Sequence, residues 1–204
     1  MIKPSPVQLI DDFLGSVHIL SSAVNELLAH RLQDVSGGGL TFSQLKLLNL
    51  IALTEGHTIT DVAQFLGVSN AAASKAVDRL VRRNLLNRVE AEADRRAVVL
   101  SLTPQGRELL ESYQREARGV LNEIFGRLSG DELKDATTML DRLSLSIVDR
   151  EEGVDEVCFR CGIHFRNRCL LRQSRQRDCF FHLHRKRAAR IDSGDGSGDG
   201  VANG

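Results

Sequence analysis

Helix-initiating signals recur through the first 150 residues of the chain and divide it into a succession of helical segments. Apolar residues repeat at helical spacing from Pro6 to about Leu32, which predicts one long helix. The Ser-Gly-Gly-Gly run at residues 36–39 predicts a loop after it. Thr41 and Gln44 then have the spacing of a capping box, so a second helix starts there and runs through Ile51.

The next two predicted helices are separated by a glycine turn. The third helix extends from Thr60 to Leu66, and Gly67 breaks it. Ser69 is a favourable N-cap for a fourth helix of about fifteen residues, which ends near Asn84. A helix, a tight turn and a second helix are therefore expected in immediate succession.

A charged hairpin is predicted after these helices. Two short runs with β character, Asn87 to Glu90 and Ala97 to Leu102, are separated by the charged residues 92–96. Such a polar connection favours a hairpin whose tip is in solvent.

Two long helices complete this part of the chain. Thr103 is an N-cap and Pro104 occupies the first helical position, so a helix starts there and runs to about Arg127. A capping box at residues 129–132 opens the last helix, which runs to about Arg150.

Helix, glycine turn, helix and charged hairpin, in that order, indicate a winged helix-turn-helix. The predicted fold class is mainly α, and residues 1–150 form one winged domain flanked by N- and C-terminal helices. A small Cys-rich module is expected at residues 154–190. Residues 191–204 are a Gly/Ser/Asp tail that is too polar to fold by itself and is predicted to be disordered.

The fourth helix has the side chains expected of a helix that enters the major groove of DNA. Such a helix must be short-sided where it meets the bases, and its N-terminus attracts phosphate. Residues 69–96 carry seven bases against four acids, although the net charge of the whole chain is zero. The candidate contacts are the small residues Ser69, Asn70, Ala72 and Ser74 at the bases or phosphates, and the cations Lys75, Arg79, Arg82 and Arg83 at the phosphates.

These motifs together resemble the winged domain of the multiple-antibiotic-resistance regulator (MarR) family. The matching stretches are Ile59–Ser69, Val77–Arg83, Asp94–Ala97 and Leu102–Gly106. The family's wing carries an Asp-x-Arg signature, which Asp94 and Arg96 match. The resemblance implies that Arg96 reaches into the minor groove, that Asp94 orients it, and that Arg95 contacts phosphate.

The resemblance covers roughly residues 6–150 and also implies a quaternary structure. In the family the first and the last two helices form a homodimer, and a two-fold dimer binds a pseudo-palindromic operator in double-stranded DNA with half-sites about one helical turn apart. Family members often bind phenolic or other anionic ligands between the dimer helices and the winged domain. The resemblance therefore implies a DNA-binding transcriptional regulator, a repressor by expectation, with a possible small-molecule effector.

All four cysteines, Cys158, Cys161, Cys169 and Cys179, lie beyond the part that resembles the family. They occupy an arginine-rich segment with ten basic and three acidic residues. Structural zinc commonly uses two close Cys pairs, whereas this chain has one such pair and two lone cysteines. That asymmetry favours a [4Fe–4S] cluster, whose irons are each held by a different Cys.

Zinc remains the alternative for this module, because ligand type alone does not separate the two metals. His182 is a candidate zinc ligand in place of one Cys, whereas His184 reads as part of a polar face. Bare redox-active thiols, a docking module for a protein partner and a DNA-binding tail with incidental cysteines are the other readings. With a cluster, its loss would change how the module packs against the dimer helices and so alter DNA affinity.

Other classes of protein find little support in the sequence. The chain has no nucleophile elbow, no Gly-x-Gly-x-x-Gly motif and no phosphate loop, so we do not expect an enzyme. It has no apolar run of membrane-spanning length and no signal-peptide pattern, which predicts a cytoplasmic protein without membrane contact. His18, His30 and His57 are expected to be ordinary helix or turn residues.

Overall fold

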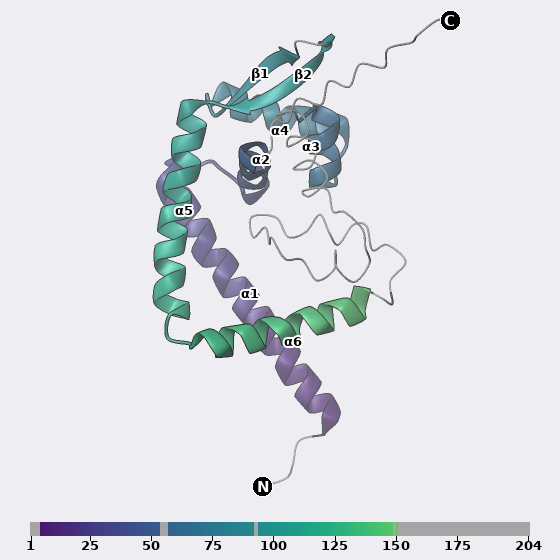
Figure 1. Cartoon of the computed structure of the whole chain (residues 1–204), viewed down its shortest axis with the longest axis vertical. Helices are drawn as coiled ribbons and strands as arrows, with labels where there is room; N and C mark the ends of the chain where they lie inside the picture. The colour runs from purple at the N-terminus through teal and green to yellow at the C-terminus, as the bar shows by residue number, and fades with distance from the viewer. Residues whose placement is uncertain (1–4, 54–56, 92–93, 149, 151–204) are drawn as a thin grey trace, which may run out of the picture.

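The computed structural model describes residues 5–53, 57–91, 94–148 and 150, with side chains at 90–98 and 148 excepted. Within these residues it contains six helices and one two-stranded sheet (Figure 1). The elements are α1 (Pro6–Ser36), α2 (Phe42–Leu53), α3 (Ile59–Leu66), α4 (Asn70–Arg82), β1 (Leu86–Ala91), β2 (Asp94–Leu102), α5 (Pro104–Phe125) and α6 (Gly130–Val148). The mainly α fold with a hairpin wing is as predicted.

Local capping chemistry explains where the helices begin. The Thr41 backbone N–H donates to the Gln44 side chain at 3.0 Å, and the Gln44 backbone N–H donates to the Thr41 hydroxyl at 3.3 Å. Ser129 and Glu132 form the same reciprocal pair at the start of α6. These two capping boxes confirm the predicted starts of α2 and α6.

The ends of α1 and α4 differ from the sequence prediction. Helix α1 continues to Ser36, four residues beyond Leu32, and ends at Gly37 in the left-handed conformation (φ 63°). Helix α4 ends at Arg82 rather than near Asn84, because Asn84 itself has a positive φ of 56°. Both ends coincide with residue types that tolerate the left-handed region.

The hairpin is also longer than predicted. Its pairing continues outward from Leu86 opposite Leu102 to Glu90 opposite Val98, and after an irregularity Ala91 pairs with Asp94. The expectation that residues 94–96 form part of the connecting tip was therefore wrong, because backbone pairing places them in β2.

His57 is the clearest error of the sequence analysis. It was expected to be an ordinary turn residue, but its side chain is completely buried. Its backbone carbonyl accepts a hydrogen bond from the Leu100 N–H at 3.1 Å and forms an isolated bridge to β2. The segment before α3 is thereby attached to the edge of the wing.

The hydrophobic core of the winged domain gathers residues from nearly every element around it. Helix α2 contributes the largest share, namely Leu45, Leu47, Leu48 and Ile51. The C-terminal end of α1 adds Leu28 and Leu32, and α5 adds Leu110, Tyr113 and Ala117. The core therefore fixes α2, α4, the hairpin and the adjoining ends of α1 and α5 as one unit.

The joint between the wing and α5 is closely packed. The Thr103 hydroxyl donates to the Asn84 carbonyl at 2.6 Å and accepts from the Gly106 N–H at 2.9 Å. A Cβ at Gly106 would lie 2.1 Å from the Leu85 carbonyl oxygen, so only glycine permits this approach.

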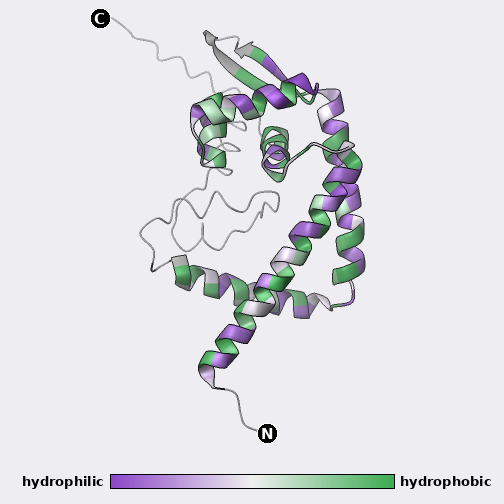
Figure 2. Ribbon diagram, turned by 180° about the vertical axis from the view of Figure 1, so that it is seen from behind, coloured by the Kyte–Doolittle hydropathy of each residue, from purple (hydrophilic) through white to green (hydrophobic). Residues whose placement is uncertain are grey.

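The outer parts of α1, α5 and α6 extend away from this core (Figure 1). No described side chain of α6 is buried, and only Leu28 and Leu32 are buried on the 31-residue helix α1. Apolar residues nevertheless run along both helices (Figure 2). Those exposed are Val7, Leu9, Ile10, Leu14, Ile19 and Leu20 on α1, and Met139, Leu140, Leu143 and Ile147 on α6.

Candidate nucleic-acid interface

Helix α4 is positioned by a tight turn and by its buried face. Gly67 ends α3 with φ 67°, and Ser69 caps α4 by accepting a hydrogen bond from the Ala72 N–H at 3.3 Å. Ala73, Val77 and Leu80 are completely buried and attach one side of α4 to the core. Because these positions recur at helical spacing, the opposite side of α4 is presented outward.

The candidate DNA contacts lie on that outward side or at the N-terminus of α4. Ser74 is half-buried, and the other candidates on this helix are exposed: Ser69, Asn70, Ala72, Lys75, Arg79 and Arg82. The small residues surround the first turns, and the cations follow toward the C-terminal end. The surface of α4 therefore combines a short-sided N-terminal half with a basic C-terminal half.

The wing candidates are described only in part. Asp94, Arg95 and Arg96 belong to β2, which places their backbone at the outer end of the hairpin. Their side chains are outside the described set, so the roles that the family resemblance implies for them remain predictions.

Arg83 does not have the environment predicted for a phosphate contact. Its guanidinium donates to the Ser36 carbonyl at 3.2 Å and to the Gly38 carbonyl at 3.2 and 3.3 Å. Ser36 is the last residue of α1, and Gly38 lies in the turn that follows. Arg83 therefore attaches the C-terminal end of α4 to the end of α1.

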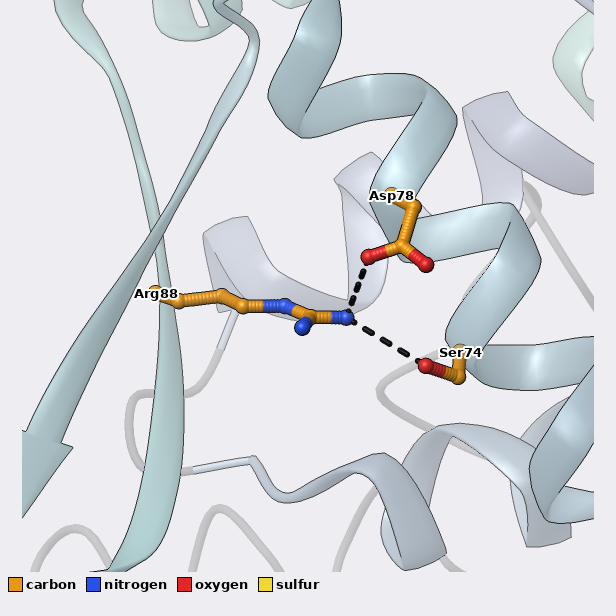
Figure 3. A network of polar contacts seen from close by, with 3 residues as sticks. All are labelled: Ser74, Asp78 and Arg88. Carbon is orange, nitrogen blue, oxygen red and sulfur yellow. Dashed lines mark hydrogen bonds and ion pairs between the residues drawn. The ribbon is translucent and has the colours of Figure 1, made fainter.

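Arg88 is a residue that the sequence analysis missed. It lies on β1, and its guanidinium extends across to α4 (Figure 3). Its Nη2 atom is 2.6 Å from Asp78 Oδ1 and 3.4 Å from Ser74 Oγ. Arg88 and the buried Leu86 are two residues apart and so share the strand face that covers α4.

A small cavity lies between α1, α2 and α5. Its volume is about 140 Å³, and its lining combines apolar and polar side chains: Leu28, Asn49, Tyr113, Gln114, Ala117, Arg118 and Leu121. The Gln114 amide donates to Asn49 Oδ1 at 3.3 Å. The Tyr113 hydroxyl is buried with no hydrogen-bond partner among the described residues, and burial raises its pKa to about 12.

The metal site predicted at Cys158, Cys161, Cys169 and Cys179 lies outside the described residues, as do His182 and the tail at 191–204. Within the described part of the chain, no group of three or more His, Cys, Asp or Glu side chains is arranged to hold a metal ion. None of the helices in that part is both long and apolar enough to cross a membrane.

Taken together, the turn between α3 and α4, the outward face of α4 and the adjacent hairpin define a winged helix-turn-helix protein. Solved structures share this architecture. YusO from Bacillus subtilis is 22% identical, and the match covers 70% of this chain and 99% of YusO at a TM-score of 0.59. The transcriptional repressor CouR, solved on a 23-mer DNA duplex, is 23% identical and covers 70% and 99% of the two chains at a TM-score of 0.54.

Sequence comparison identifies the family. Residues 38–97 match the sequence model of the MarR family. The transcriptional repressor MprA of Escherichia coli K12 is 28% identical over 130 residues, which are 63% of this chain and 73% of MprA. Over residues 38–97 the chain is similar to the MarR family. It is a DNA-binding transcriptional regulator and not an enzyme.

Proposed function

We propose that the protein is a sequence-specific repressor that binds a pseudo-palindromic operator as a homodimer. The observation that carries this proposal is the outward face of α4, where small residues precede the exposed cations Lys75, Arg79 and Arg82. In this arrangement α4 enters the major groove and the wing approaches the adjacent minor groove. MprA and CouR are both named as transcriptional repressors, which favours repression over activation.

The exposed apolar residues of α1 and α6 support the homodimer. Ile19 and Ile147 are 68% and 63% exposed, and several further apolar side chains on the two helices are about half exposed. Large exposed apolar surface marks an interaction site. A second copy of the chain fits it, because MarR-family proteins typically bind their operators as dimers.

Selection from a randomised pool of DNA duplexes tests this function. The wild-type protein should enrich an inverted repeat whose half-sites are centred about 10 base pairs apart. Arg82→Ala should weaken binding to all duplexes and reduce the slope of log affinity against log salt by about one. Arg115→Ala, an exposed change of the same charge on α5, is the matched control. Enrichment of no sequence would contradict the proposal.

The cavity supports a second element of function, which is control by a small anionic aromatic ligand. A dry cavity of about 150 Å³ is enough for a benzene ring, and the volume here is about 140 Å³. The Tyr113 hydroxyl offers an unused hydrogen bond, and Arg118 at the lining offers a positive charge. Leu28, Ala117 and Leu121 provide the apolar walls. An aromatic carboxylate would satisfy all three features, whereas a neutral phenol would use the Tyr113 hydroxyl and the apolar walls.

Benzoate and phenol are suitable probes, because Tyr113 is the only tyrosine and the chain has no tryptophan. Intrinsic fluorescence therefore reports on this cavity alone. Benzoate should quench or shift the Tyr113 emission and lower DNA affinity, and Arg118→Ala should weaken benzoate binding while leaving phenol binding unchanged. Unchanged emission with both probes at saturating concentration would exclude this ligand class.

We also propose that the four cysteines hold a [4Fe–4S] cluster, with zinc as the alternative, and that this site modulates DNA affinity. The support is the sequence pattern, a single Cys-x-x-Cys pair followed by two lone cysteines. Protein purified without oxygen should be brown and contain iron and sulfide near four per chain. Colourless protein with about one zinc per chain would instead indicate a structural site. Cys161→Ala should abolish the metal signal in either case, whereas metal retained in this variant would contradict the site.

A further inference from the structure

The contact between β1 and α4 fixes a guanidinium beside a candidate DNA-reading hydroxyl (Figure 3). Asp78 and Ser74 are one turn apart on α4, so both face the same neighbour. The Arg88 Nη2 atom is held at 2.6 Å from the Asp78 carboxylate and lies 3.4 Å from the Ser74 hydroxyl oxygen. The ion pair with Asp78 is therefore the stronger contact of Nη2, and it holds this atom close enough to donate a weaker hydrogen bond to Ser74.

This arrangement restricts what the Ser74 hydroxyl can do. A guanidinium only donates hydrogen bonds, so Ser74 Oγ must accept from Arg88 and direct its own proton elsewhere. Other helical hydroxyls turn inward: those of Ser16, Thr137 and Ser144 donate to carbonyls four residues earlier at 2.7–2.9 Å. In the described part of the chain, Ser74 makes no such bond, and its contact with Arg88 is the one it has. Its proton is therefore available at the surface of α4.

We propose that Arg88 is a positioning residue that fixes Ser74 as a hydrogen-bond donor to DNA. The inference rests on the proposed function, in which α4 enters the major groove. A hydroxyl fixed as a donor prefers a base-pair edge with an acceptor, such as purine N7, guanine O6 or thymine O4. Because Arg88 already occupies one of the two lone pairs of the oxygen, this hydroxyl pairs less readily with the exocyclic amines of adenine and cytosine than a freely rotating hydroxyl would.

A different role for Arg88 makes different predictions. If Arg88 left Asp78 to bind a phosphate, it would strengthen binding to every sequence and add about one to the salt slope. As a positioning residue it contributes nothing to the salt slope, because its charge stays paired with Asp78. Binding to selected and unselected DNA therefore distinguishes the two roles.

The experiment uses the full-length protein and the duplex that the wild type selects from a randomised pool, with a permuted duplex of equal length as the unselected DNA. Each base pair of the selected half-site is then replaced in turn. Arg88→Ala and Ser74→Ala should each weaken binding to the selected duplex about five-fold, the worth of one hydrogen bond. Both should relax discrimination at the same base pair, and the double variant should be no worse than either single variant.

Matched variants separate this effect from loss of folding or charge. Asp78→Asn should relax discrimination at that same base pair, because it weakens the ion pair that holds Arg88. Arg82→Ala should weaken binding to both duplexes and lower the salt slope by about one. Thermal unfolding should be nearly unchanged in all of them, since the Arg88 and Asp78 side chains are 37% and 43% exposed.

Three outcomes would overturn the inference. Equal weakening on both duplexes with a lower salt slope for Arg88→Ala would make Arg88 a phosphate contact. Relaxation at different base pairs, or additive losses in the double variant, would separate Arg88 from Ser74. A wild-type protein that selects no sequence would end the proposed function itself, a result distinct from the other two.

Discussion

At the scale of single residues, the unusual group is the hydroxyl of Tyr113. It lies in the cavity between α1, α2 and α5 and has no partner among the described residues. A buried polar group without a hydrogen bond reduces stability unless a ligand or water satisfies it. The same burial disfavours the charged phenolate and raises the pKa of Tyr113 from 10.0 to about 12.

This pKa shift gives stability a defined dependence on alkaline pH. The folded state keeps the proton more tightly, so the contribution of Tyr113 is fully present below pH 10 and is lost as the pH rises toward 12. An absorbance titration of tyrosinate should give a midpoint near 12 in the folded protein and near 10 in denaturant. A folded-state midpoint near 10 would contradict the buried position. Tyr113→Phe should leave the free energy of unfolding unchanged or increase it.

At the scale of elements, the joint between β2 and α5 sets the position of the wing. The Thr103 hydroxyl joins the end of α4 to the start of α5 through the Asn84 carbonyl and the Gly106 N–H. The first turn of α5 then packs against the Leu85 carbonyl with no space for a side chain at Gly106. The wing therefore has little freedom to move relative to α5.

Two glycine substitutions on α5 test this packing. Gly106→Ala should lower the free energy of unfolding by about 2 kcal/mol or more, because its Cβ would overlap the Leu85 carbonyl oxygen. Gly119→Ala, where nothing lies within 4 Å, should instead raise it by about 0.4–1 kcal/mol. Denaturant titrations of the two variants measure both values. An unchanged free energy of unfolding in Gly106→Ala would show that the backbone around Leu85 and Gly106 moves apart at little cost.

Elements were predictable from the sequence wherever the cause is local. The capping box at Thr41 and Gln44 needs only neighbouring residues, and the prediction that α2 starts there was confirmed. The partners of Arg83, 45 and 47 residues away, and those of Arg88, 10 and 14 residues away, depend on how elements pack together. No local pattern encodes them, so Arg83 was assigned to phosphate and Arg88 was overlooked.

At the scale of the whole molecule, the core accounts for the winged domain but not for the outer helices. Helix α6 buries none of its described side chains, and Met139, Leu143 and Ile147 are 48%, 43% and 63% exposed. These three recur every four residues and so form one apolar stripe. The proposed homodimer would cover this stripe together with the exposed apolar residues of α1.

A charge placed in the stripe should separate the subunits. Leu143→Glu should shift the mass measured by light scattering from dimer to monomer and reduce operator affinity, since one half-site then binds alone. Thr138→Glu, an exposed change on the other side of α6, should remain dimeric. If Leu143→Glu remains dimeric, the dimer interface does not include this stripe of α6. The stability of the winged core within this variant should change little, because no α6 side chain is buried in that core.

The attachment of Arg83 to the carbonyls of Ser36 and Gly38 has a mechanical consequence. It joins the C-terminal end of α4 to the C-terminal end of α1, whose outer half extends away from the core. Thirty-one residues of α helix span about 46 Å. If the two helices tilt together, a change of about four degrees over the length of α1 would displace the outward face of α4 by about 3 Å. This distance is close to the 3.4 Å step between base pairs. In the proposed homodimer, a tilt of this size would shift the contacts of one half-site by about one base pair.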